Sequence, residues 1–71
     1  MVTVITSPNC FPCKITKQVL TREGIAFEER NVAEDPAALD EAKALGYMET
    51  PVVIAGDRHW SGLRPDLLST L

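Results

Sequence analysis

The residues of this chain best suited to carry out chemistry are two cysteines separated by two residues, Cys10 and Cys13. They are its only cysteines. They follow an apolar alternating segment and open a segment with helical periodicity. A thiol at a helix N-terminus faces unpaired backbone N–H groups and the positive end of the helix dipole, which favours the reactive thiolate. The placement predicts a dithiol redox centre in which Cys10 is the nucleophile. Cys13, carried inward by one turn, is the resolving thiol.

The spacing of the two cysteines also allows them to form a disulfide reversibly. A disulfide needs Cα atoms within about 7 Å, which the first turn of a helix provides for residues i and i+3. A purely structural disulfide is disfavoured, because loop-closure stabilisation grows with loop length and this ring encloses only two residues between its ends.

Metal binding is an alternative use of the cysteine pair. Structural zinc needs four ligands, and the pair supplies half of them. The other candidates are His59, which we expect to be a solvent-facing strand residue, and scattered carboxylates. We therefore expect no metal site within one chain. A module in which two chains pool their cysteines around zinc or an iron–sulfur cluster stays open as a second alternative.

Length, composition and charge narrow the class of protein. The chain has 71 residues, 45% of them hydrophobic and 24% charged, which predicts one globular domain over residues 1–71. No apolar run approaches the roughly 20 residues of a membrane span, and no signal peptide is apparent, so we expect a cytoplasmic monomer. In the cytoplasm thiols are kept reduced, and a C-x-x-C pair is more often catalytic than structural. The net charge of −3 argues against a nucleic-acid partner.

The charges are unevenly distributed along the chain. Lys14, Lys17 and Arg22 follow the cysteines, while the middle of the chain is acidic. Cations within a turn or two of Cys10 favour its thiolate and can steer an acidic partner. A solvated helix face is an equally good interpretation of the same three residues.

The first half of the chain predicts a strand, a helix and a second strand. Apolar residues before Thr6 suit a central strand that ends at the turn-forming residues 7–9. Helical spacing from Pro12 to Glu23 predicts a helix that Gly24 ends. Residues 25–32 form a weaker strand whose charges suit a sheet edge. The apolar positions expected on the helix are Ile15, Val19 and Leu20.

The second half predicts a helix, a hairpin and a short helix. Asp35 is the expected N-cap of a helix that Gly46 ends, with Leu39, Ala42 and Leu45 as its buried stripe. Residues 51–55 and 58–60 form a hairpin, and a last helix starts near Pro65. The order β-α-β-α-β-β-α predicts an α/β fold with a four-stranded mixed sheet and three helices. A C-x-x-C beside such a parallel unit is typical of the thioredoxin fold.

Three runs of residues resemble the NrdH redoxins, small glutaredoxin-like proteins of the thioredoxin superfamily, and the similarity covers essentially the whole chain. The runs are Cys10-Phe11-Pro12-Cys13, Thr50-Pro51-Val52 and Trp60-Ser61-Gly62-Leu63-Arg64-Pro65. The resemblance implies a thioredoxin fold, no bound cofactor, and a role as reductant of class Ib ribonucleotide reductase, itself re-reduced by thioredoxin reductase with NADPH. Two positions depart from the usual pattern: Pro12 stands where the family commonly has Gln, and Leu63 where it has Phe.

The resemblance also implies a partner-binding surface around the dithiol. An X-Pro bond is cis in only about 5% of cases, so the residues alone favour trans, but thioredoxin-fold proteins place a cis-proline beside the disulfide. Pro51 is then expected to be cis, with the Thr50 backbone pairing with an incoming chain. The full predicted surface comprises Phe11, Pro12, Thr50, Pro51, Trp60, Ser61, Gly62 and Arg64.

Two of these residues have competing interpretations. Trp60 either fills the small core or has a role at the surface of the protein. Arg64 either reaches an acidic partner or holds the Ser61-Gly62 loop, and the following proline favours the second because it restricts Arg64 to extended geometry.

A glutathione-dependent glutaredoxin is the first alternative function. Glutaredoxins typically hold glutathione with a basic residue just before the dithiol and a Gly-Gly turn after the last strand. This chain has Ser7-Pro8-Asn9 and Trp60-Ser61-Gly62 at those places. We therefore expect poor glutathione binding and a preference for protein reductants.

Overall fold

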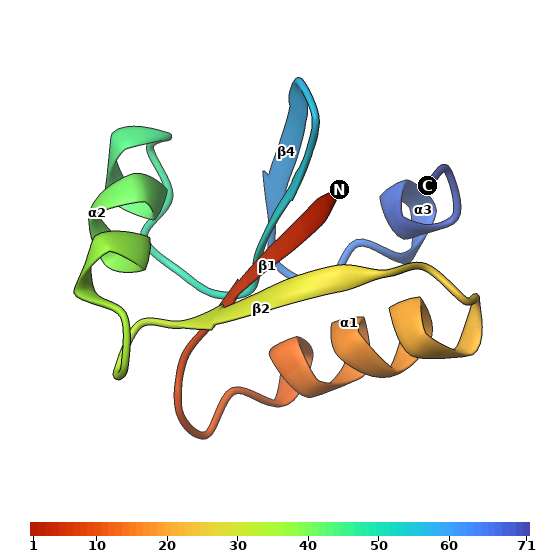
Figure 1. Ribbon diagram of the computed structural model, residues 1–71, viewed down its shortest axis with the longest axis horizontal. Coiled ribbons are helices and arrows are strands. Elements are labelled where there is room, and N and C mark those ends of the chain that lie inside the picture. Colours follow the sequence, from red (N-terminus) through yellow and green to blue (C-terminus); the bar gives the residue numbers. More distant parts are fainter.

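The order of helices and strands is the one predicted. The computed structural model describes residues 1–71. Its elements are β1 (Val2–Thr6), α1 (Phe11–Arg22), β2 (Phe27–Asn31), α2 (Pro36–Ala44), β3 (Val52–Ala55), β4 (Arg58–Ser61) and α3 (Pro65–Leu68) (Figure 1). None of the helices is both long and apolar enough to cross a membrane.

The strands form one mixed sheet in the order β2-β1-β3-β4. β1 pairs in parallel with β2 and antiparallel with β3, and β3 pairs antiparallel with β4. β1 is therefore central and β2 lies at an edge, as predicted. This is the thioredoxin-like fold. It places the C-terminal end of β1, and the turn into α1, at one end of the strands (Figure 1).

Alternating side chains of β1 divide the core between the two faces of the sheet. Val4 packs with Leu20 of α1 and Leu68 of α3 on one face. Ile5, the next residue, packs with Ala38 and Ala42 of α2 on the other. Figure 1 shows the same division, with α2 on one side of the sheet and α1 and α3 on the other. The first helix, which carries the cysteines, is thus packed against the central strand.

The predicted buried stripe of α2 was wrong at two of its three positions. Leu39 and Leu45 are 41% and 37% exposed, while Ala38 and Ala42 are buried. Residues i and i+4 share one helix face, and two alanines on that face let α2 lie close to the sheet. The larger leucines are displaced to the flanks.

The helix boundaries differ slightly from the predicted ones. α1 begins at Phe11, one residue before Pro12, and its buried residues are Cys13, Thr16 and Leu20, with Ile15 and Val19 only half-buried.

Asp35 stands at the N-cap position of α2 as predicted, but its side chain makes no capping hydrogen bond. It accepts instead from Arg30 at 2.9 Å. Gly24 and Gly46 have positive φ angles of 72° and 91°, which suits their predicted role as helix stops.

Candidate redox site

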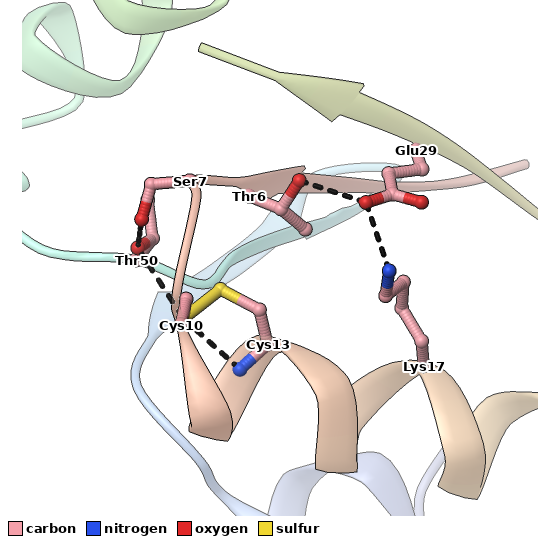
Figure 2. Close-up of a disulfide and its surroundings, with 7 residues drawn as sticks. All are labelled: Thr6, Ser7, Cys10, Cys13, Lys17, Glu29 and Thr50. Carbon is pink, nitrogen blue, oxygen red and sulfur yellow. Dashed lines mark hydrogen bonds and ion pairs between the residues drawn. A yellow bond between two sulfur atoms is a disulfide. The ribbon is translucent and has the colours of Figure 1, made fainter. Parts of the chain in front are cut away.

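Cys10 and Cys13 are joined by a disulfide at the start of α1, with their Cα atoms 5.2 Å apart (Figure 2). Cys10 is the N-cap of the helix, and its Sγ accepts a hydrogen bond from the Cys13 N–H at 3.1 Å. Asn9, with φ at 58°, turns the chain into the helix. Cys13 is only 2% exposed, whereas Cys10 is half-buried. One sulfur is therefore accessible and the other shielded, as the spacing predicts.

Two hydroxyl groups lie on the Cys10 side of the disulfide. The Thr50 hydroxyl donates to Cys10 Sγ at 3.5 Å, and its oxygen lies 2.6 Å from Ser7 Oγ (Figure 2). These contacts connect the turn after β1 with the loop before β3. Hydrogen bonds to a thiolate stabilise the charged form. The sequence marks Ser7 only as a turn residue, so its place at this site was missed.

The Thr50–Pro51 peptide bond is cis, as the resemblance implied. Pro51 is buried, and its carbonyl accepts from the Gly62 N–H at 2.8 Å, which ties the loop after β4 to this turn. Neither the N–H nor the C=O of Thr50 has a backbone hydrogen-bond partner. An extended chain can use both groups to add a short strand beside the dithiol.

A pair of opposite charges lies on the Cys13 side. Lys17 of α1 donates to Glu29 Oε2 of β2 at 3.0 Å, and the buried Thr6 hydroxyl donates to the same oxygen at 2.9 Å (Figure 2). The hydrogen bond from Lys17 is the main cause that lowers the pKa of Glu29, and the Thr6 hydroxyl adds to it. Lys17 is therefore paired, while Lys14 is exposed.

Comparison with known proteins identifies the family. A glutaredoxin family model matches residues 2–60. The glutaredoxin-like protein NrdH of Salmonella typhimurium is 43% identical over 70 residues, covering 99% of this chain and 86% of that protein. NrdH of Lactococcus lactis subsp. lactis is 38% identical over 71 residues, covering 100% and 99% respectively. The solved structure of the glutaredoxin-like protein NrdH-redoxin from Escherichia coli has a TM-score of 0.94 at 41% identity, covering 99% of this chain and 92% of that one.

This chain belongs to the glutaredoxin family, among the NrdH redoxins. Members of that group are thiol-disulfide oxidoreductases with a redox-active cysteine pair, and the Cys10–Cys13 disulfide stands in that position. The family resemblance read from the sequence is thereby confirmed.

The structure separates the predicted partner-binding residues of this redoxin into exposed and buried ones. Phe11 is 69% exposed beside Cys10, and Pro12 is exposed next to it. Trp60 is only 5% exposed and packs in the core on the α1 face. The core interpretation of Trp60 is therefore the right one, and its indole presents almost no surface for a partner. Ser61 and Gly62 are half-buried.

Arg64 has a structural contact of its own. Its guanidinium makes two hydrogen bonds to the Asp66 carboxylate, at 3.2 and 3.0 Å, in the first turn of α3. Arg64 also lowers the pKa of Asp66 through these bonds. The predicted hold on the Ser61-Gly62 loop is therefore not seen, because the Arg64 side chain binds the start of α3 instead.

Two cavities flank the disulfide of this redoxin. One, of about 410 Å³, opens between the dithiol loop and α2, and Leu39, Tyr47, Met48 and Thr50 are among its lining residues. The other, of about 640 Å³, is lined by both cysteines and by Thr6, Lys14, Lys17 and Glu29. The sequence assigned Leu39 to the core and gave no role to Met48, which is 88% exposed. The α2 side of the site was therefore missed.

Proposed function

We propose that this redoxin is a dithiol electron carrier that thioredoxin reductase reduces with NADPH and that passes electrons to class Ib ribonucleotide reductase. The observation that supports it most directly is the asymmetry of the pair, in which Cys10 caps α1 and Cys13 is 2% exposed. We further propose that the chain acts as a monomer in the cytoplasm, where thiols are kept reduced.

The proposed reaction has two exchange steps. The Cys10 thiolate attacks one sulfur of the target disulfide, which forms a Cys10–target bond and releases the other target sulfur as a thiolate. Cys13 then loses its proton to water and attacks Cys10 Sγ. The Cys10–Cys13 bond forms, the mixed disulfide breaks, and the second target sulfur leaves. The target gains two electrons and, with two protons from solvent, becomes a dithiol.

Partner selection is proposed to depend on exposed groups around Cys10. Phe11 offers an apolar contact, and the unpaired backbone of Thr50 offers a donor and an acceptor. A few aromatic contacts of this kind dominate the energetics of many protein interfaces.

Glutathione reduction is the competing function, and one observation favours it. Lys43 lines the cavity between α2 and the dithiol loop, and Cys10 lines the same cavity. Its ammonium is a possible partner for a carboxylate of glutathione. The test must therefore compare both reductants.

The test is NADPH oxidation coupled to reduction of the Cys10–Cys13 disulfide. We expect fast turnover with thioredoxin reductase and slow turnover with glutathione plus glutathione reductase. Phe11→Ser should lower kcat/KM with thioredoxin reductase about tenfold, the loss expected from one interface anchor. Leu45→Ser, which removes an exposed leucine that lines neither cavity beside the disulfide, is the matched control and should change nothing. Equal efficiency with both reductants would transfer the assignment to a glutathione-dependent glutaredoxin.

A further inference from the structure

The ion pair between Lys17 and Glu29 lies beside the sulfur that the proposed reaction uses second. Cys13 and Lys17 are four residues apart on α1, a spacing that puts them on the same helix face with Cβ atoms about 5–6 Å apart. Glu29 faces them from β2 across the 640 Å³ cavity that all three line. In Figure 2 the pair lies on the Cys13 side of the disulfide, opposite Thr50.

The charges around the dithiol come from few groups. Lys14 and Lys17 of α1 and Glu29 of β2 line the cavity that includes Cys13, to which β1 contributes only the hydroxyl of Thr6. Lys43 and Glu49 line the other cavity, which includes Cys10 and not Cys13. The charges that face Cys13 are therefore those of α1 and β2.

Glu29 is arranged to bind the Lys17 ammonium. Both hydrogen bonds to the carboxylate go to Oε2, one from the ammonium and one from the Thr6 hydroxyl. Thr6 is 2% exposed, so this second donor is fixed within the sheet. The carboxylate is ionised at neutral pH, since its ordinary pKa is 4.5 and the hydrogen bond from Lys17 lowers that value further. The pair as a whole carries no net charge.

We propose that Glu29 is a positioning residue that binds Lys17 in a neutral pair and so keeps Cys13 protonated while Cys10 is the thiolate. This inference rests on the proposed roles of the two cysteines. A free ammonium beside Cys13 would stabilise a second thiolate next to the first. With the pair neutral, the N–H groups of the helix N-terminus favour the thiolate at Cys10 alone.

We test the inference by titrating the two thiols of the reduced protein and detecting each thiolate by its absorbance at 240 nm. Two interacting thiols titrate in two macroscopic steps. Glu29→Gln leaves Lys17 uncompensated and should lower the higher of the two pKa values by about 0.5–1 unit. Lys17→Gln should raise it by a similar amount. The double variant should return to within about 0.3 unit of the original protein, because both charges are then absent.

Glu28→Gln is the matched control. Glu28 is the neighbour of Glu29 in β2 and is exposed, and successive strand residues point to opposite faces of a sheet. Glu28→Gln changes the net charge as much as Glu29→Gln does but leaves the ion pair between Lys17 and Glu29 intact. It should therefore leave the titration of both thiols unchanged.

Two results would overturn the inference: equal shifts from Glu28→Gln and Glu29→Gln, or a double variant that keeps the full shift of Glu29→Gln. Circular dichroism of each reduced variant confirms that it is folded. The titration needs no partner protein, so a failure here is distinct from failure of the reductase assay, which tests the proposed function.

Discussion

At the scale of single residues, the difference between the two sulfurs comes from what each one touches. Cys10 Sγ faces the Cys13 N–H and the Thr50 hydroxyl, two donors that stabilise a negative charge. Cys13 is almost fully buried and makes no corresponding hydrogen bond through its sulfur. The chemistry of the pair is therefore unequal even though the two residues are identical.

This inequality predicts which variant captures a target. Cys13→Ser should accumulate a mixed disulfide through Cys10 in most of the protein, because the resolving thiol is missing. Cys10→Ser should accumulate almost none, since its remaining thiol is shielded. Non-reducing electrophoresis and mass spectrometry of the adduct with a disulfide-containing target measure both. The double serine variant is the control, and preferential trapping by Cys10→Ser would reverse the two roles.

At the scale of helices and strands, sequence periodicity predicted every element in order but not every buried face. Ala38 and Ala42 form the contact face of α2 because small residues permit close packing, a property that an apolar stripe of leucines does not reveal. Trp60 had two equally good interpretations until the packing of β4 against the core was known. Glu29 is one of several acidic residues in its segment, and only the pairing of β1 with β2 brings it to the dithiol. Local sequence patterns therefore predict the helices and strands, whereas contacts between distant parts of the chain determine whether residues such as Trp60 and Glu29 lie in the core or at the site.

Thr16 provides a prediction at this scale. It is 0% exposed in α1, and its hydroxyl oxygen has no hydrogen-bond partner. A buried hydroxyl without a partner costs about 1–3 kcal/mol. Thr16→Val replaces it with a methyl group of similar size, and we expect the free energy of unfolding to rise by about 1 kcal/mol.

Urea denaturation followed by Trp60 fluorescence measures this change. Thr21→Val, at an exposed position of the same helix, is the control, and it should be neutral or slightly destabilising because a valine gains nothing in water. A Thr16→Val protein less stable than the original would show that the hydroxyl is satisfied.

At the scale of the whole molecule, ion pairs connect the edge strand β2 to a helix on each face of the sheet. Arg30 of β2 binds Asp35 at the start of α2 and also Glu41 within it. Glu29, the preceding residue, binds Lys17 of α1. β2 has only half-buried or exposed residues, so it has little apolar burial to hold it. These bridges link β2 to both helix layers.

The bridges predict how stability changes with pH. Hydrogen bonds from Arg30 lower the pKa of Asp35, and those from Lys17 lower the pKa of Glu29, from ordinary values of 3.8 and 4.5. A carboxylate with a lowered folded-state pKa contributes stability that is present above its ordinary pKa. That contribution is lost as the pH falls through the folded value. We therefore expect the melting temperature to be constant near neutrality and to fall below about pH 4.5.

Arg30→Met isolates the α2 bridge. It should lower the melting temperature by a few degrees at pH 7, because exposed and half-exposed pairs are individually weak. The difference from the original protein should shrink as the pH falls through the lowered pKa of Asp35, because that carboxylate then loses its charge in both proteins. Arg22→Met is the control, since the Arg22 guanidinium forms an ion pair only with its neighbour Glu23, at 3.7 Å, and that pair links no two elements. A difference between the Arg30→Met and original proteins that persists unchanged at pH 2 would mean that Arg30 stabilises the fold through the packing of its aliphatic stem and not through its charge.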